Sequence, residues 1–404
     1  MKDATVRFGS VDWASQKHSA CVVDGDGRVV DDLEVAHESA GLSALCRCFL
    51  RARVHRVAIE RPDGPVVEAL MDAGLEVVVV SSRSVKALRT RYGLAGNKDD
   101  RSDAFVLADC LRTDGHRWPS LQPDSPTTVA LRSAVRSRKD LVAARIATTN
   151  QLRAHLDVVF PGAVGLFVDL ERPISLSFLE RFPTATKAAW LSERRLSAWL
   201  RANAYSGRTP AAELLRRLHA APRGRHGAAA ASQAEVTLVL VQVLRTLLAG
   251  IDRLKAQITE QLALHPDGFI FQSLPRSGTV RAAAMLAEIG DCRARFPTPD
   301  ALACLAGAVP STRSSGKHRA VTFRWSCDKK LRDALMDFAQ DSRRGSPWAE
   351  HLYRRHRAQR KTHPHISRIL ARSWIDVIWR CWQDRVAYDP DRHRALQRVL
   401  AMGG

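Results

Sequence analysis

Short apolar runs separated by turn residues dominate the first 80 residues of the chain. These runs predict β-strands at residues 6–11, 19–23, 28–35, 54–59 and 76–80. The run Asp24-Gly25-Asp26-Gly27 follows the second strand and predicts the turn of a hairpin. Apolar residues at helical spacing predict helices at residues 41–51 and 65–73. This order of elements predicts an α/β domain with a mixed sheet.

The middle of the chain has the pattern of two long helices. Residues 127–160 and 233–264 carry apolar positions at spacings that mix threes and fours, which predicts two helices packed antiparallel, as in a coiled coil. The spacing leaves open whether the two helices pair within one chain or between subunits. A Pro- and Ser-rich segment at residues 118–126 precedes them, and residues 162–231 between them predict a smaller helical insert.

The last third of the chain predicts mainly helices. Arg181-Phe182-Pro183-Thr184 reappears as Arg295-Phe296-Pro297-Thr298, and a helix capped by threonine after each proline explains the similarity, with a duplicated module as the alternative. The stripe of Trp and Ile at residues 366–382 predicts a core helix rather than a base-stacking surface. The predicted domains are therefore residues 1–118, 119–265 with the insert 162–231, and 266–404.

Charge changes this picture by indicating a partner. Sixty-two basic and 42 acidic residues give a formal charge of +20, which predicts an anionic polymer such as nucleic acid as the partner, although a GC-rich genome would also enrich arginine. No apolar run reaches the roughly 18 residues of a membrane span, and no signal peptide is recognised at the start. The eight cysteines include no C-x-x-C pair, so we expect reduced thiols in a cytoplasmic protein.

Acidic residues are placed where the predicted sheet and its helices end. Asp12 lies on the first strand, Glu60 ends the fourth, and Asp100 and Asp103 share a face at the start of a predicted helix. The last two are also explained as a charged helix N-terminus. If all four converge, a bound cation is needed to make the cluster tolerable, and oxygen ligands suit Mg²⁺ or Mn²⁺.

A family resemblance rests on three segments, which are Gly9 to His18, Ala58-Ile59-Glu60 and Lys98 to Ala104. They resemble the DEDD signature of the insertion sequence 110 family of transposases, which have a RuvC-like, RNase H-fold domain and include the pilin-gene inverting recombinases. The resemblance implies that the metal carboxylates are Asp12, Glu60, Asp100 and Asp103. Asp99 is one position out of step with the signature. The residues after Glu60 depart from the usual pattern and make Asp63 a competing acid.

Two turn-rich segments with basic residues in the last third of the chain are candidates for binding phosphate. Ser273 to Ala282 resembles the P-G-x-G turn of a helix-hairpin-helix, with Arg276 in place of the first glycine, which weakens phosphate binding by backbone amides and offers a charge instead. Ser311 to Arg319 reads as a loop of hydroxyls among the cations Arg313, Lys317, His318 and Arg319, and as Ser-Ser-Gly it is also an ordinary turn.

The second segment is similar to the C-terminal transposase domain of the same family. The matching features are A-G-x-x-P at residues 306–310, Ser-Gly a few residues later, and a helix holding Leu331-Arg332. The resemblance implies that Ser315 is the nucleophile toward DNA, with Ser314 as the open alternative. The family's Gly-Asn before that helix is replaced by Cys327-Asp328. No carboxylate base lies in the loop, so we expect the metal of the first domain to serve Ser315 in the assembled enzyme.

The resemblance implies a DNA transposase and recombinase that cuts and rejoins strands through a phosphoserine link. It implies donor and target DNA as partners, a homo-oligomer formed through the coiled coil, and in some members a bridge RNA that guides the reaction. Arginines expected to bind nucleic acid also lie in the tail, at Arg354, Arg355 and Arg357, where a solvated helix face is the alternative. The competing functions are a RuvC-like nuclease that hydrolyses DNA and a non-catalytic nucleic-acid-binding protein.

Overall fold

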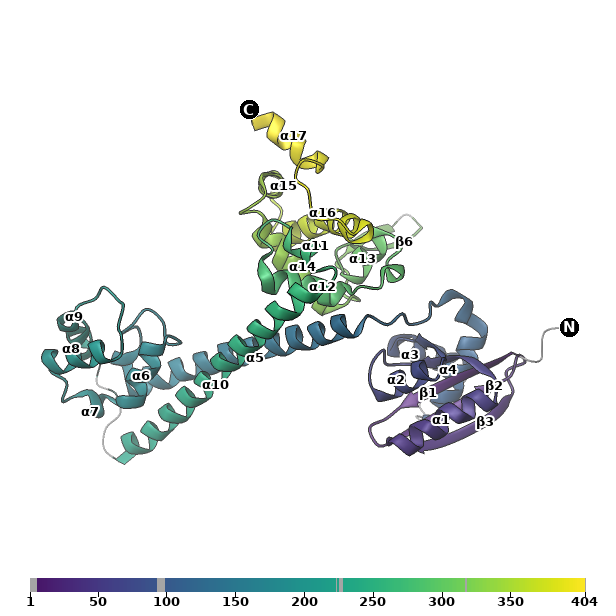
Figure 1. The fold of residues 1–404 in the computed structure, drawn as a ribbon, viewed down its shortest axis with the longest axis horizontal. Helices are drawn as coiled ribbons and strands as arrows, with labels where there is room; N and C mark the ends of the chain where they lie inside the picture. The colour runs from purple at the N-terminus through teal and green to yellow at the C-terminus, as the bar shows by residue number, and fades with distance from the viewer. Residues whose placement is uncertain (1–5, 93–98, 223, 225–227, 317, 404) are drawn as a thin grey trace. The chain divides into compact units, whose positions relative to one another are not determined.

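The computed structural model describes residues 6–92, 99–222, 224, 228–316 and 318–403. The chain forms two compact units, residues 1–123 and 124–404, and each is described by itself. Figure 1 gives the labels used below.

The first unit is built on one mixed sheet, as the apolar pattern predicts. Its order is β3-β2-β1-β4-β5, and its strands are β1 (Arg7–Trp13), β2 (Lys17–Val23), β3 (Val29–Ala36), β4 (Val54–Ile59) and β5 (Glu76–Val79). The first three strands form an antiparallel meander, and β4 pairs parallel with both β1 and β5. The predicted hairpin turn joins β2 to β3.

Helices cover both faces of this sheet. On one face α1 (Ser39–Arg51) and α2 (Pro65–Asp72) share a core with the strands that includes Val11 and Ile59. On the other face α4 (Asp100–Asp114) packs through Leu107 and Leu111 onto β4 and β5, with α3 (Ser82–Arg89) beside it. Two 3-10 turns follow these helices, at Thr90–Tyr92 and Gly115–Arg117. The sequence pattern did not predict α3, which has only eight residues.

Gly9 sets how closely α1 approaches β1. A Cβ atom at this position would lie 3.0 Å from the ring of Phe49 and 3.0 Å from Val54. Phe49 is fully buried in the core under α1. A larger residue at position 9 would therefore push α1 away from the strand that carries Asp12.

Two long helices run side by side through the second unit (Figure 1). They are α5 (Pro126–Val159) and α10 (Ala228–Leu264). Leu131, near the start of α5, shares a core with Ile258, near the end of α10, whereas Leu156 shares another with Leu240. The pair is therefore antiparallel, as the spacing predicts. Ser125 caps α5 by accepting a hydrogen bond from the Thr128 N–H.

Short helices fill the segment between the two long ones. They are α6 (Pro173–Arg181), α7 (Ala185–Ala188), α8 (Glu193–Ala202) and α9 (Ala211–Ala220), after a 3-10 turn at Pro161–Ala163. Their core is formed with the adjoining parts of α5 and α10. The predicted helical insert is thus observed.

The remaining elements form a mainly helical body with one small hairpin. They are α11 (Gly268–Gln272), α12 (Gly278–Ile289), a 3-10 turn (Arg293–Arg295), α13 (Pro299–Leu305), β6 (Ser311–Ser315), β7 (His318–Thr322), α14 (Lys329–Ser342), α15 (Pro347–Ala358), α16 (His363–Asp384) and α17 (Arg394–Gly403). Trp374 and Trp382 of α16 are fully buried, so the Trp and Ile stripe is core, as predicted. Thr184 and Thr298 each cap a helix, which accounts for the repeated Arg-Phe-Pro-Thr sequence.

The long helix α10 has one further property. Within the described residues, Ser232–Leu264 is long and apolar enough to cross a membrane by length and composition alone, with a mean hydropathy of 1.7 in its most apolar part. The sequence analysis did not select this segment, because polar residues interrupt every apolar run in it. Leu240, Val241 and Leu244 of this helix pack into the core shared with α5 and the insert.

Candidate functional site

Asp12 and Glu60 lie at the same end of neighbouring strands. Val11 of β1 and Ile59 of β4 are register partners in a parallel pair, and each directly precedes one of the two acids. Neighbouring strands are about 4.8 Å apart. The fold therefore brings together two carboxylates that are 48 positions apart in the sequence.

Asp12 lies on the sheet face that α4 covers, and Glu60 directly follows the strand whose Ala58 is on that face. Ser10, two positions before Asp12, donates a hydrogen bond from Oγ to the backbone carbonyl of Ala104 in α4 at 2.5 Å. Ala58, two positions before Glu60, packs in the core that α4 covers. Because side chains alternate along a strand, residues two apart share a face. Asp12 and Glu60 are both partly buried there.

The first turn of α4 supplies acids to the same face. Asp103 is 2% exposed, and its carboxylate forms an ion pair with Arg89 of α3. Asp100 is exposed one turn earlier. Asp99 caps the helix by accepting hydrogen bonds from the backbone N–H and the hydroxyl of Ser102, at 3.4 and 3.1 Å. Asp99 thus has a local structural role as the cap of this helix.

The donor set fits a hard divalent cation in its chemistry. Carboxylate oxygens are the ligands that Mg²⁺ and Mn²⁺ prefer, and Asp12, Glu60 and Asp103 lie on one face at one end of the sheet. In the described part of the chain, no three metal-ligating side chains are close enough together to hold an ion. Arg89 instead compensates the charge of the buried Asp103. Binding an ion at Asp103 therefore requires this ion pair to open.

Asp63 is less well placed than Glu60. It lies between β4 and α2, is exposed, and pairs with Arg61 at 3.4 Å. The guanidinium of Arg61 lies over the ring of Trp13, 4.3 Å from its centroid. Asp63 is therefore held in solvent beyond the end of the strand.

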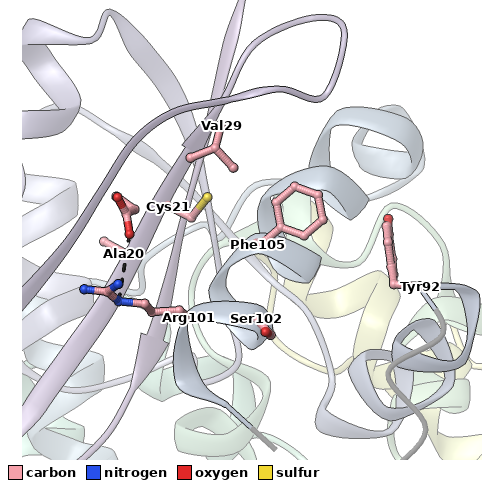
Figure 2. A pocket seen from close by; sticks show the side chains of 8 residues that line it. Ala20, Cys21, Val29, Tyr92, Arg101, Ser102 and Phe105 are labelled. Carbon is pink, nitrogen blue, oxygen red and sulfur yellow. Dashed lines mark ion pairs between the residues drawn. The ribbon is translucent and has the colours of Figure 1, made fainter. Parts of the chain in front are cut away.

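A pocket of about 370 Å³ is lined by residues of β2, β3 and the start of α4 (Figure 2). Cys21, Tyr92 and Phe105 line it, and Arg101 pairs with Asp32 at its rim at 3.9 Å. Burial raises the pKa of the Cys21 thiol to about 12, so this thiol stays protonated and is not a nucleophile. None of the four predicted metal carboxylates lines this pocket.

The segment around Ser315 is a β-hairpin, not the loop expected from its sequence. β6 and β7 pair antiparallel, and Ser315 and His318 are the pair nearest the turn. Gly316 has a φ of +54°, a left-handed conformation that glycine adopts without strain. The hydroxyl residues and the cations Arg313 and Arg319 therefore lie on two strands that pair with each other.

Alternation separates the two serines. Ser315 shares a face of the hairpin with Arg313, two positions earlier, whereas Ser314 is the register partner of Arg319 on the other face. All four residues are exposed. Lys317 lies outside the described residues. Each serine therefore has a different arginine beside it.

The other predicted nucleic-acid arginines differ in how far their charge is neutralised. Arg276, with a φ of +63°, pairs with Asp341 at 3.4 Å. Arg354 pairs with Glu350 at 2.8 Å. Arg355 and Arg357 are exposed and form no ion pair among the described residues, although Arg357 donates a hydrogen bond to the Lys361 carbonyl at 3.1 Å. The charges that remain available in α15 are those of Arg355 and Arg357.

Sequence reasoning missed two groups of residues that the fold assembles. One is Arg89, whose pairing with Asp103 depends on the short helix α3. The other surrounds Phe323 and Trp325, just after β7, where Arg332 and Arg368 approach the Phe323 ring. The sequence analysis named Arg332 of the second group only in the Leu331-Arg332 match, and the Phe-x-Trp sequence at residues 323–325 was a further signal.

Comparison with known proteins gives consistent matches along the chain. Residues 10–161 match a DEDD-type family described as Transposase, and residues 269–354 match the Transposase IS116/IS110/IS902 family. The mini-circle putative transposase for IS117 of Streptomyces coelicolor is 32% identical over 97% of both chains. The putative transposase y4uE of Sinorhizobium fredii is 33% identical over 58% of this chain and 64% of its own. The insertion element IS900 uncharacterized 42 kDa protein of Mycobacterium paratuberculosis is 28% identical over 95% of this chain and 97% of its own.

Proposed function

Because the chain belongs to the IS110 family of transposases, we propose that it cuts and rejoins DNA strands with a carboxylate site in the first unit and a serine in the second. The observation that carries this proposal is the shared end and shared face of Asp12 and Glu60 on parallel strands packed against α4. The two acids are partly buried. They suit the binding of a cation next to a phosphate.

Asp12, Glu60, Asp100 and Asp103 would hold Mg²⁺ or Mn²⁺. When bound, such an ion supplies Lewis-acid stabilisation to phosphate oxygens and favours the ionised form of an attacking hydroxyl. Asp12 and Glu60 are oriented by rigid strands, and Asp103 by the first turn of α4. Asp100 is exposed and would complete the donor set from the same helix.

Ser315 is the proposed nucleophile. Its Oγ forms a bond to the phosphorus of a phosphodiester and gives up its proton, while the bond from phosphorus to the departing strand breaks and that strand's oxygen takes up a proton. The product is a phosphoserine ester. The reverse step, with the hydroxyl of another strand, releases Ser315 and joins DNA. Arg313 lies on the same face of the hairpin and would stabilise the charge on the phosphate.

The partners follow from charge and from exposed apolar surface. The formal charge of +20 supports binding to DNA, and to a bridge RNA that would guide the reaction. Exposed apolar side chains on α5 and α10, among them Ile146, Val239 and Val243, support a homo-oligomer paired through a coiled coil. The functional domains would be residues 1–118, 119–265 and 266–404, acting in the bacterial cytoplasm.

Substitution of the carboxylates tests the site. Asp12→Asn and Glu60→Gln should abolish strand cleavage, measured on labelled DNA, while circular dichroism and unfolding show an intact fold. Asp63→Asn is the matched control, because it removes an exposed acid three positions from Glu60 and should cleave normally. Asp99→Asn, which keeps a capping side chain, should also cleave normally. Full cleavage by Asp12→Asn or Glu60→Gln would rule out the carboxylate site.

A hydrolytic nuclease is the competing function, because the same carboxylates activate water in RuvC-like enzymes. It would use Asp12 and Glu60 but would leave Ser315 without a role. A protein that only binds nucleic acid would use neither. Cleavage that depends on the carboxylates but not on Ser315 would identify the nuclease.

A further inference from the structure

An aromatic pair, the partly buried Phe323 and the exposed Trp325, lies just after the hairpin that carries Ser315. The ring of Phe323 meets that of Trp325 edge to face, with centroids 4.7 Å apart and planes at 83°. Trp325 is 78% exposed, and among the described tryptophans only Trp190, at 48%, also has a side chain counted as exposed. An indole ring left in water at this extent marks a contact surface rather than a core position.

Two arginines lie close to the ring of Phe323. The guanidinium of Arg332, from α14, lies 5.5 Å from the centroid of Phe323, and that of Arg368, from α16, lies 4.9 Å from it. Neither forms an ion pair with an acid in the described part of the chain, and Arg332 donates its one recorded hydrogen bond to the sulfur of Cys327, at 3.5 Å. Arg372, one turn beyond Arg368, is instead bound by both Asp300 and Asp376 at 2.6 Å.

The two guanidiniums therefore form an uncompensated positive site. Burial, together with the charge of Arg332, lowers the pKa of Arg368 from its usual value. An anion between the two arginines would relieve this unfavourable pairing. Planar guanidiniums bind a phosphate through two parallel hydrogen bonds, which an ammonium group does not match.

These residues also line a cavity. Its volume is about 440 Å³, and its walls include Phe323, Trp325, Arg332, Arg368 and Pro364. A second cavity, of about 450 Å³, adjoins it and shares Phe323 and Arg368. Each has the size of a site for a small organic molecule. The walls offer a flat ring and a cationic edge, which match the two parts of a nucleotide.

We propose that Phe323, Trp325, Arg332 and Arg368 form a site for an unpaired nucleotide of a DNA strand. The base stacks on Trp325, and the phosphate is bound by Arg332 and Arg368. Stacking of this kind requires an exposed base face, which a paired duplex does not offer. Phe323 orients Trp325 by its edge-to-face contact and leaves the outer face of the indole free.

The choice of DNA over RNA rests on the proposed function, in which Ser315 attacks a DNA strand. The site begins at Phe323, the residue that directly follows β7. Ser315 lies four residues after Ser311, which is at the base of the hairpin, and four residues of a strand span about 14 Å. A strand attacked at Ser315 would therefore have neighbouring nucleotides close to Trp325. The site would hold an unpaired nucleotide on one side of the cut phosphodiester while the strand on the other side of the cut is exchanged.

Binding of short labelled oligonucleotides to full-length protein tests this site. The Ser315→Ala background is used without Mg²⁺ and with EDTA, so that neither a serine nor a metal-dependent mechanism cleaves the DNA. Fluorescence anisotropy is measured with a dT 12-mer, a matched RNA U 12-mer and a duplex of equal length. Trp325→Ala should weaken binding of the dT strand roughly 10-fold, and Trp325→Phe should retain most of the affinity. Binding to duplex should not change.

The arginines should have a different signature. Arg332→Ala and Arg368→Ala should each weaken single-strand binding and reduce the salt slope by about 0.7, whereas Trp325→Ala should leave the slope unchanged. Arg380→Ala is the matched control, because Arg380 is an exposed α16 arginine that already pairs with Asp384 at 3.9 Å, and it should change neither quantity.

Three results would overturn the proposal. Equal losses on duplex and single strand would make the residues part of a general duplex surface. Binding of RNA but not DNA would assign the site to an RNA strand. Unchanged DNA affinity together with an altered oligomeric state of Trp325→Ala, measured by light scattering, would make this surface a subunit contact. Because all measurements are of binding in EDTA, where neither mechanism cleaves DNA, none depends on whether Ser315 is the nucleophile.

Discussion

Arg89 of α3 forms an ion pair with the buried carboxylate of Asp103, at the position where the DEDD signature implies a metal ligand. The Asp103 side chain is 3% exposed and that of Arg89 is 26% exposed. A buried carboxylate without a cation is strongly unfavourable, and Arg89 provides that cation in the protein alone. Arg89 therefore competes with a divalent ion for Asp103, and metal binding should release it.

Removal of Arg89 should make the protein less stable without metal and more responsive to metal. Arg89→Ala leaves Asp103 buried and unpaired, which should cost about 3 kcal/mol of unfolding free energy. Mg²⁺ should restore part of this loss, so its stabilising effect should be larger in the variant than in the wild-type protein. The measurement is denaturant unfolding with and without Mg²⁺, which needs no DNA and no turnover.

Arg101→Ala is the control for this experiment. Arg101 is an exposed arginine of α4 that pairs with Asp32 at 3.9 Å, so its loss should change stability little in either condition. An equal stabilisation by Mg²⁺ of the wild-type protein and Arg89→Ala would show that Arg89 and the ion do not compete for Asp103.

The charge of α15 leads to a prediction about salt. The observed rate or affinity of duplex binding should fall with salt at a log–log slope of roughly −0.9 per phosphate contacted. Arg355→Ala and Arg357→Ala together should flatten that slope, because neither residue has an acidic partner among the described residues. Arg354→Ala should have a smaller effect, since Glu350 already pairs with Arg354 at 2.8 Å. An affinity independent of salt would remove nucleic acid as the reason for the charge.

His265 should make the second unit sensitive to acid. Its Nδ1 accepts a hydrogen bond from the Asp267 N–H at 3.0 Å, so the ring proton is on Nε2, which donates to Thr128 Oγ1 at 2.8 Å. Burial lowers the pKa of His265 from 6.5, although Asp291 lies 4.0 Å away and opposes this shift. Protonation would also place two N–H groups against each other at Nδ1.

The sign of the effect follows from the lowered pKa. The unfolded chain takes up the proton more readily than the folded protein, so the contribution of His265 to stability is complete above pH 6.5. It falls as the pH decreases from there toward the pKa of the folded state. His265→Gln should be less stable at pH 8 but should lose less stability between pH 7 and 5. Parallel curves for the two proteins would show that His265 does not titrate in this range.

The sequence predicted the sheet and both long helices because these elements carry strong local signals. Turn residues bound each strand, and apolar spacing extends over more than 30 residues in α5 and α10. Asp12 and Glu60 could be found because the parallel pairing of two apolar strands aligns their ends. The hairpin at Ser311–Thr322 was missed because its strands are short, polar and exposed.

The remaining parts of the site depend on tertiary contacts. Arg89 lies in a helix of eight residues whose local pattern is weak, and only packing brings it to Asp103. Phe323, Arg332 and Arg368 come from three elements, so no window of sequence displays them together. Ser315 was singled out by the family resemblance, whereas its separation from Ser314 follows only from the strand.

That separation makes the central claim directly testable. If Ser315 is the nucleophile, cleavage passes through a covalent ester between its Oγ and DNA, and the ester conserves the energy of the phosphodiester so that rejoining needs no ATP. Ser314→Ala is a matched control, because Ser314 projects from the opposite face of β6 beside Arg319.

The most direct measurement is trapping of this ester. Labelled DNA with a strand break near the cut site is incubated with protein and Mg²⁺, the products are separated on a denaturing gel, and the attached peptide is mapped. We predict an adduct at Ser315 with the wild-type protein and Ser314→Ala, and none with Ser315→Ala, which should still bind DNA. Free DNA ends without an adduct, or full recombination by Ser315→Ala, would contradict the serine mechanism and identify a hydrolytic nuclease.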